Sequence, residues 1–201
     1  MAKNLSNPLK VALRNRMKGE VLKSITPESR ARQSKAITEK VLQTDAFRSS
    51  KRISIYLSTS TEVDTGELLN ECFRLEKHVF VPTYEGNNME MVRLKNLEDY
   101  ESLPLTKWKI KQPSAKEGRE NALTNGQGID LFLMPGVAFT RVGGRMGHGM
   151  GYYDTYLTRH HATYPNKKTT LMALAFQEQI VDETELPLDA HDVKLHTIIT
   201  E

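Results

Sequence analysis

Four short, almost uninterrupted apolar runs divide this 201-residue chain: ISIYLS (53–58), HVFVP (78–82), IDLFLMPG (129–136) and TTLMALAF (169–176). Segments with the periodicity of an amphipathic helix lie before and between them. Strands that are apolar on both faces are typical of a parallel sheet covered by helices. The chain is therefore predicted to form a single α/β domain over residues 1–201, with a mainly parallel sheet flanked by helices on both faces.

Further elements follow from apolar periodicity and from the residues that begin and end helices. Helices are expected at 8–24, from Thr26 to Leu42, at 65–76 and at 152–161, and strands at 88–94 and 195–200. Pro82 is expected to end the second strand, because proline cannot donate a hydrogen bond to a neighbouring strand. His160 and His161 fall at the end of their helix, where positive charge is favourable.

Composition excludes several classes of protein. No apolar run approaches the roughly 18 residues of a membrane-spanning helix, and a net charge of +3 is too small to indicate nucleic-acid binding. The one cysteine, Cys72, cannot form an internal disulfide, which favours a reducing compartment such as the cytoplasm. Residues 1–19 are basic and contain no acid, as in a transit peptide, so a mitochondrial pool stays open, although the helical pattern continues past them. We expect small-molecule partners and a monomer.

The segment GGRMGHGMGYYD (143–154) places five glycines between a strand and a helix. Backbone amides in such a loop can approach an anion closely, and the following helix directs its N-terminus to the same place, so the loop is predicted to bind phosphate. The alternative is a glycine-rich hairpin or surface turn. The G-x-G-x-x-G pattern is absent, and Met150 and Gly151 stand where a Walker A loop needs lysine and a hydroxyl residue.

Three charged positions have two interpretations each. Asp154 either stabilises the helix dipole or holds Mg²⁺. Lys10 and Arg14, four residues apart on one helix face, either reach phosphates together or are solvated.

Longer stretches carry a resemblance to a known family. MPGVAFTRVGGRMGHGMGYYD (134–154) resembles the signature of the 5-formyltetrahydrofolate cyclo-ligase family, and KxxxR (10–14), KRISIYLS (51–58) with Glu62 after it, MEMVRL (89–94), TKWKI (106–110) and ALAFQEQ (173–179) fall in the same order. The resemblance implies a fold similar to the NagB/RpiA/CoA-transferase-like fold. It also implies an ATP- and Mg²⁺-dependent conversion of 5-formyltetrahydrofolate to 5,10-methenyltetrahydrofolate, with release of ADP and phosphate. The formyl oxygen is phosphorylated first, and ring closure follows.

The same resemblance implies roles for individual residues. Arg145 and His148 are the expected catalytic donors, and Asp154 and Asp192 are expected to hold Mg²⁺. The expected ATP ligands are Lys10, Arg14, Arg145, Met146, Gly147, His148, Gly149, Met150, Gly151, Tyr152 and Tyr153. The expected folate ligands are Leu57, Glu62, Trp108, His148, Gly149, Met150, Gly151 and Tyr152. The chain departs from the family pattern at Met150, where many members have lysine, and at Thr140, where aspartate is usual.

Two other functions remain open from the residues alone. An isomerase or transferase acting on phosphorylated or CoA-linked substrates fits the same general fold, but it needs a carboxylate base that no motif supplies convincingly. A non-catalytic folate- or nucleotide-binding module fits the same loop.

Overall fold

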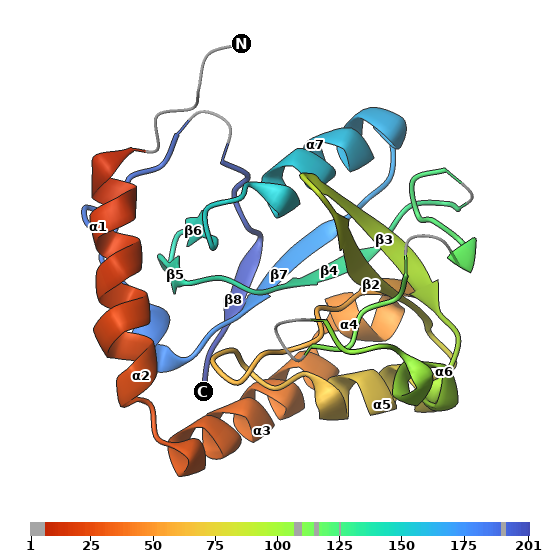
Figure 1. Ribbon diagram of the computed structural model, residues 1–201, viewed down its shortest axis with the longest axis horizontal. Helices are drawn as coiled ribbons and strands as arrows, with labels where there is room; N and C mark the ends of the chain where they lie inside the picture. The colour runs from red at the N-terminus through yellow and green to blue at the C-terminus, as the bar shows by residue number, and fades with distance from the viewer. Residues whose placement is uncertain (1–6, 107–109, 115–116, 125, 190–191) are drawn as a thin grey trace.

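The computed structural model describes residues 7–106, 110–114, 117–124, 126–189 and 192–201, and the described residues include a six-stranded sheet (Figure 1). Its order is β3-β2-β1-β4-β7-β8. The strands are β1 (Arg52–Ser54), β2 (His78–Glu85), β3 (Asn88–Leu94), β4 (Leu131–Met134), β7 (Thr170–Leu174) and β8 (Thr197–Ile199). Every neighbouring pair is parallel except β2 and β3 at one edge. The mainly parallel sheet is thus confirmed.

Helices cover both faces of the sheet, as predicted. They are α3 (Pro27–Gln43), α4 (Asp45–Ser49) and α5 (Gly66–Arg74) on one face, and α7 (Tyr152–Thr163) on the other. The short α6 (Leu97–Ser102) follows β3. In β4, Leu131 and Leu133 belong to the core under α3, α4 and α5, whereas Phe132 and Met134 belong to the core under α7. This alternation is why the strand reads as continuously apolar.

An N-terminal helical segment lies beside the sheet. It consists of α1 (Pro8–Arg16), a π-helical turn η1 (Met17–Val21) and α2 (Leu22–Ser24), which together cover the predicted helix. Leu13 and Met17 share a small apolar cluster with Val137, Ala138 and Met146. These partners lie in or beside a hairpin of two short strands, β5 (Ala138–Phe139) and β6 (Arg145–Met146), which stands between α1 and the sheet (Figure 1). The sequence left a hairpin open only as the alternative for the glycine-rich loop.

The expectation that Pro82 ends the second strand is wrong. β2 continues through Pro82, which pairs with Met91 of β3. β1 lies on the other side of β2. It is much shorter than the predicted strand and pairs with β2 only as far as Phe80. Pro82 therefore lies beyond the last residue of β2 that pairs with β1, a position at which proline is tolerated in a sheet.

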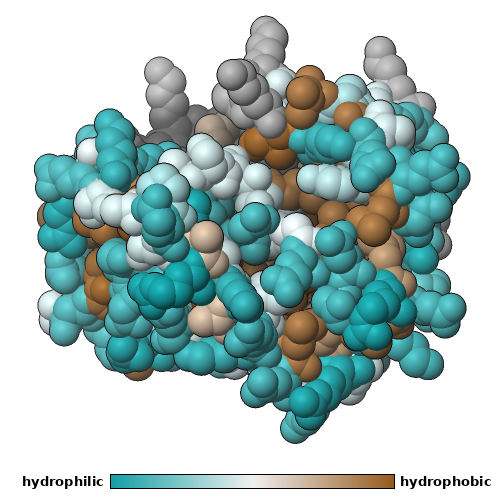
Figure 2. Space-filling model, turned by 90° about the horizontal axis from the view of Figure 1, so that it is seen from below, coloured by the Kyte–Doolittle hydropathy of each residue, from teal (hydrophilic) through white to brown (hydrophobic). Residues whose placement is uncertain are grey.

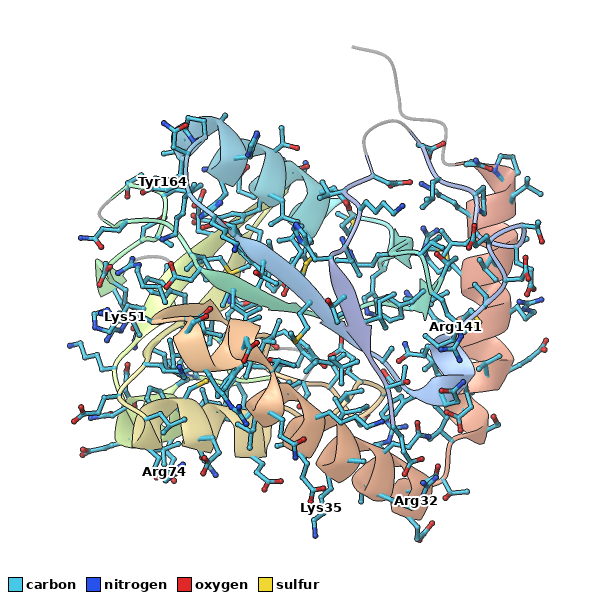
Figure 3. All side chains as sticks on the ribbon, turned by 180° about the vertical axis from the view of Figure 1, so that it is seen from behind. Arg32, Lys35, Lys51, Arg74, Arg141 and Tyr164 are labelled. Carbon is cyan, nitrogen blue, oxygen red and sulfur yellow. The ribbon has the colours of Figure 1, made fainter. Side chains whose placement is uncertain are left out.

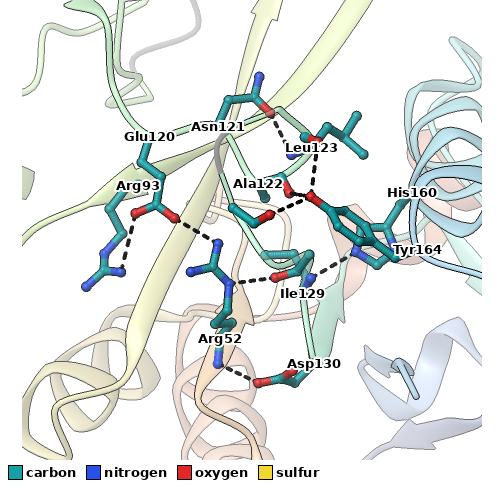
Figure 4. A network of polar contacts seen from close by, with 12 residues as sticks. Arg52, Arg93, Glu120, Asn121, Ala122, Leu123, Ile129, Asp130, His160 and Tyr164 are labelled. Atoms are coloured by element: carbon teal, nitrogen blue, oxygen red, sulfur yellow. Dashed lines mark hydrogen bonds and ion pairs between the residues drawn. The ribbon is translucent and has the colours of Figure 1, made fainter. Parts of the chain in front are cut away.

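The expectation of a positively charged His160 is also wrong. Its Nε2 accepts a hydrogen bond of 2.8 Å from the backbone N–H of Ile129, so the ring is neutral (Figure 4). Burial, helped by the charges of Lys167 and His161, lowers the pKa of His160 to about 4. The side chain attaches α7 to the segment leading into β4.

Neighbouring contacts hold the same segment against the sheet. The hydroxyl of Tyr164 donates toward the carbonyls of Ala122, Leu123 and Gly126 at 2.8–3.0 Å. Arg52 of β1 donates to the Gly128 carbonyl at 2.7 Å and pairs with Glu120 at 2.8 Å (Figure 4). These contacts satisfy backbone groups of a stretch that has little regular structure of its own.

The outer faces of the helices are polar. The face seen from below, onto which α3 and α5 turn, is mostly hydrophilic, with apolar side chains gathered mainly toward one side (Figure 2). Arg32 and Lys35 project from α3 into solvent, and Arg74 projects from the end of α5 (Figure 3). None of the described helices combines the length and the apolar character needed to cross a membrane.

Candidate functional site

A cleft of about 610 Å³ opens at the carboxyl ends of the central strands. β1 and β4 are neighbours in the sheet, but the chain continues from β1 to β2 on one side and from β4 to β7 on the other. Open α/β sheets bind ligands at such a switch point, because the loops leave the strands in opposite directions there. The cleft lies where the sequence placed the glycine-rich loop.

Most of the predicted site residues line this cleft. They are Lys10, Arg14, Glu62, Arg145, Met146, Gly147, His148, Gly149, Met150, Gly151, Tyr152, Tyr153, Asp154 and Asp192. Further lining residues, which the sequence reasoning missed, are Asn7, Tyr84, Pro135, Thr155, Thr158, Arg159 and Asp189. The cleft thus joins segments from α1, from the loops after β1 and β4, and from the approach to β8.

The five glycines divide between two structures. Gly143 and Gly144 form part of the β5–β6 turn and do not line the cleft, so the alternative of a hairpin is correct for them. Gly147, Gly149 and Gly151 line the cleft, and the last two have φ angles of +109° and +69°, which favour glycine. Gly151 is the N-cap of α7, so the first amides of that helix face the cleft region without a capping side chain.

The basic face of α1 contacts the loop directly. Arg14 donates from Nε to the carbonyl of Gly147 at 3.0 Å. Lys10 is nearly buried, and its Nζ contacts Asp189 at 2.7 Å and also contacts Asp192. The four-residue spacing therefore brings both cations to the cleft, and the solvated interpretation is wrong for Lys10.

Arg145 is the most enclosed cation of the cleft, with only 4% of its side chain exposed. One terminal nitrogen donates to the Pro135 carbonyl at 3.2 Å and the other contacts Asp154 at 3.1 Å. The guanidinium also lies 5.3 Å from the centre of the Tyr153 ring. Asp154 accepts a second hydrogen bond, from the backbone N–H of Val193, at 3.1 Å. Charge and orientation of this arginine are thus fixed by backbone and side-chain partners.

On the opposite wall, Glu62 faces His148 across the cleft. The distance from Glu62 Oε1 to His148 Nε2 is 3.5 Å, and Glu62 Oε2 accepts from the backbone N–H of Thr59 at 2.8 Å. Burial alone would raise the pKa of Glu62, but the hydrogen bonds from His148 and Thr59 outweigh it, and the pKa is lowered. Glu62 is therefore an ionised hydrogen-bond acceptor at neutral pH.

An aromatic pair closes one end of the cleft. The rings of Tyr84 and Tyr152 lie 4.9 Å apart in a tilted arrangement, and the Tyr152 hydroxyl donates to the Gly86 carbonyl at 2.9 Å. Burial raises the pKa of Tyr84, which keeps its hydroxyl neutral. The sequence reasoning missed Tyr84 because no motif contains it. It lies in β2, which is next to β1 in the sheet.

The acids of the cleft can be compared with the needs of Mg²⁺. Asp154 and Asp192 both line it, but each already contacts a cation, Arg145 and Lys10 respectively. Among the described residues there is no cluster of three acid, histidine or cysteine groups that could enclose a metal ion. Mg²⁺ in proteins commonly takes one or two carboxylates together with phosphate oxygens and waters. The two aspartates fit a cation that arrives with a phosphate ligand.

Four predicted or unusual positions need separate mention. Leu57 is partly buried against the core under α3 and α5 and is not among the cleft residues. Trp108 lies outside the described residues. Met150 is 60% exposed at the cleft, so no charge replaces the lysine of the family pattern there. Thr140 is buried, and its Oγ1 accepts from the backbone N–H of Gly144 at 3.0 Å, which stabilises the hairpin turn.

Comparison with known proteins agrees with the resemblance in the sequence. A model of the 5-formyltetrahydrofolate cyclo-ligase family matches residues 6–201. The chain is 41% identical to the 5-formyltetrahydrofolate cyclo-ligase of Mus musculus, over 100% of this chain and 98% of the mouse protein. It is 37% identical to a probable 5-formyltetrahydrofolate cyclo-ligase of Caenorhabditis elegans, over 96% and 93% of the two chains.

A solved structure shares the fold as well. The 5,10-methenyltetrahydrofolate synthetase of Aquifex aeolicus superposes with a TM-score of 0.75 at 28% identity, covering 95% of this chain and 89% of that one. The family model, the curated relatives and the solved structure agree with one another. The chain belongs to the 5-formyltetrahydrofolate cyclo-ligase family.

Proposed function

We propose that this chain is an enzyme that converts 5-formyltetrahydrofolate to 5,10-methenyltetrahydrofolate, with ATP as co-substrate and Mg²⁺ as its counter-ion. The observation that carries the proposal is the convergence of Lys10, Arg14 and Arg145 on a glycine-rich loop, opposite the ionised Glu62. Cations and backbone amides can bind a phosphate chain, whereas the carboxylate of Glu62 can bind a ligand that donates hydrogen bonds. One cleft can therefore hold two different substrates against each other.

The chemistry explains why a phosphate donor is needed. The oxygen of a formamide is a poor leaving group. When the formyl oxygen attacks the γ-phosphorus, ADP leaves and the formyl carbon becomes activated. The lone pair of the neighbouring folate nitrogen then adds to that carbon, its proton is released, and phosphate leaves. Phosphoryl transfer asks the protein mainly for positioning and for positive charge around the transferring group.

Arg145 is the residue best placed to supply that charge. The Pro135 carbonyl and the Tyr153 ring hold the guanidinium at the cleft before any substrate arrives, so exchanging Asp154 for a phosphate oxygen needs little reorganisation. Lys10, Arg14 and His148 would contact the remaining phosphate oxygens. Glu62 would accept hydrogen bonds from the donor edge of the pteridine ring. Leu57 and Trp108 stay predictions for the folate side.

Asp154 and Asp192 would hold Mg²⁺, which would offset the negative charge of the phosphate chain. Lys10 and Arg145, which the two aspartates contact in the structure, would then turn to phosphate oxygens instead.

The test is to incubate the purified protein with 5-formyltetrahydrofolate, ATP and Mg²⁺ and to follow the near-ultraviolet absorbance of the methenyl product. Product formation that requires ATP and Mg²⁺ supports the proposal. Tight folate or nucleotide binding without turnover would instead identify a non-catalytic binding module. We further propose that the chain acts as a monomer in the cytoplasm, which sedimentation and cell fractionation would test.

A further inference from the structure

A second hollow, of about 540 Å³, lies on the far side of the loop that carries Glu62. We call it the α3 groove. One wall is a single face of α3, formed by Arg30, Ser34 and Thr38 at four-residue intervals, and Ser60 and Asp64 of the loop after β1 face it. None of these residues belongs to the cleft described above.

Arg30 is the unusual member of this groove. Its Nη1 is buried and has no hydrogen-bond partner, and among the described residues Arg30 forms no ion pair. Its guanidinium carbon lies 5.4 Å from the centre of the Phe176 ring, which fixes the side chain in place. A buried donor without an acceptor is rare in folded proteins and calls for a ligand, an ion or a water.

The acids of the groove do not meet this need. Asp64 accepts at Oδ1 from the backbone N–H of Gly66 at 2.9 Å, as part of the turn before α5. Glu67 is exposed at the rim. Ser34 accepts from the backbone N–H of Asp64 at 3.0 Å, and its own O–H has no acceptor among the described residues. A guanidinium N–H and a hydroxyl O–H therefore both lack acceptors on one face of α3.

We propose that the α3 groove binds a carboxylate, and that the carboxylate belongs to the glutamyl end of the folate substrate. Arginine binds carboxylates with two parallel hydrogen bonds, and a serine hydroxyl can add a third. Ser60 and Asp64 of the groove flank Glu62 of the cleft in one short loop, so a substrate held by Glu62 lies next to the groove. This assignment rests on the proposed function, and a free dicarboxylate from solution is the other source of the same chemistry.

The first experiment compares 5-formyltetrahydrofolate with the analogue that lacks the glutamyl residue, 5-formyltetrahydropteroate. The Arg30→Gln substitution is expected to raise KM for 5-formyltetrahydrofolate about tenfold, which corresponds to about 1.4 kcal/mol. KM for the pteroate analogue and kcat for both should not change. Arg30→Lys keeps the charge and should restore part of the affinity. Arg32→Gln, on the exposed side of the same helix, is the matched control (Figure 3).

The second experiment needs no turnover. Binding of glutarate is measured by NMR, through the Arg30 side-chain signals in the wild type and through the backbone amide signals of Ser34 and Asp64 in both the wild type and Arg30→Gln, after thermal melting has shown that the variant is folded. Glutarate binding together with the selective KM effect supports the substrate as the source. If glutarate binds but Arg30→Gln changes KM for the two substrates by the same factor, the groove still binds a carboxylate, and that carboxylate belongs to a separate ligand.

The absence of both effects overturns the proposal. If the wild type forms no methenyl product at all, the proposed function fails, while the glutarate measurement still decides whether the groove binds a carboxylate.

Discussion

The guanidinium of Arg145 lies 3.1 Å from the carboxylate of Asp154, so a residue expected to bind phosphate neutralises a residue expected to bind metal. The same relation joins Lys10 to Asp192. A phosphate with its counter-ion can replace these pairs without leaving a buried charge alone, since the phosphate takes the cations and the metal takes the acids. Such an exchange avoids the cost of an unpaired charge in a desolvated site.

Arg145→Ala is expected to lower kcat by about 10²- to 10³-fold, the loss usually seen when a fixed charge at a developing anion is removed. The readout is the rate of methenyl product formation. Arg141→Ala, an exposed position in the neighbouring β5–β6 turn, should leave the rate unchanged. Wild-type turnover by Arg145→Ala would show that this arginine serves only the structure.

Asp192→Asn is expected to raise the Mg²⁺ concentration at half-maximal rate severalfold, because a carboxylate oxygen binds this hard cation better than an amide does. Asp189→Asn removes a contact to Lys10 but not a predicted metal ligand, so it should raise KM for ATP and leave the Mg²⁺ titration as in the wild type. Identical Mg²⁺ titrations for wild type and Asp192→Asn would contradict the metal assignment.

Glu62→Gln is expected to raise KM for the folate by about ten- to a hundredfold, since hydrogen bonds to an ionised acceptor contribute about 1.5–3 kcal/mol. KM for ATP should change little. Steady-state kinetics with each substrate varied in turn separates the two. An equal rise in KM for the folate and in KM for ATP would mean that Glu62 affects the whole cleft through His148 rather than binding the folate.

His160 makes the stability of the fold depend on pH. Its pKa of about 4 in the folded protein lies below the ordinary value of 6.5, so the unfolded chain takes up a proton that the folded chain does not. Stability is therefore full above pH 6.5 and falls as the pH drops toward 4, by up to about 3 kcal/mol from this group. Urea unfolding across that range should show a flatter profile for His160→Gln.

The exposed neighbour provides the control for this measurement. His161→Gln removes only the smallest cause of the lowered pKa of His160, so it should keep most of the wild-type pH profile. A His160→Gln profile that overlays the wild type would show that the buried ring does not control acid stability.

The fold was predictable because a strand that is apolar throughout, such as β4, indicates that helices cover both faces of the sheet. The β5–β6 hairpin was not, since strands of two residues leave no periodicity, and the glycines in its turn read as part of the phosphate loop. The loop was found because its glycine spacing has a chemical meaning, whereas Lys10 and Arg14 were chosen because of the family resemblance. Tyr84, Asp189 and Arg30 carry no such local signal, and only folding brings the first two to the cleft and Arg30 to the α3 groove.

Lys10 and Asp192 meet although 182 positions separate them in the sequence. Contacts of such separation carry a high loop-closure entropy and form late in folding. During synthesis, α1 leaves the ribosome long before its acidic partners exist, so this wall of the cleft is assembled only when nearly the whole chain is present. Nucleotide or folate would then bind only complete chains, and by mass action this binding would protect them from unfolding.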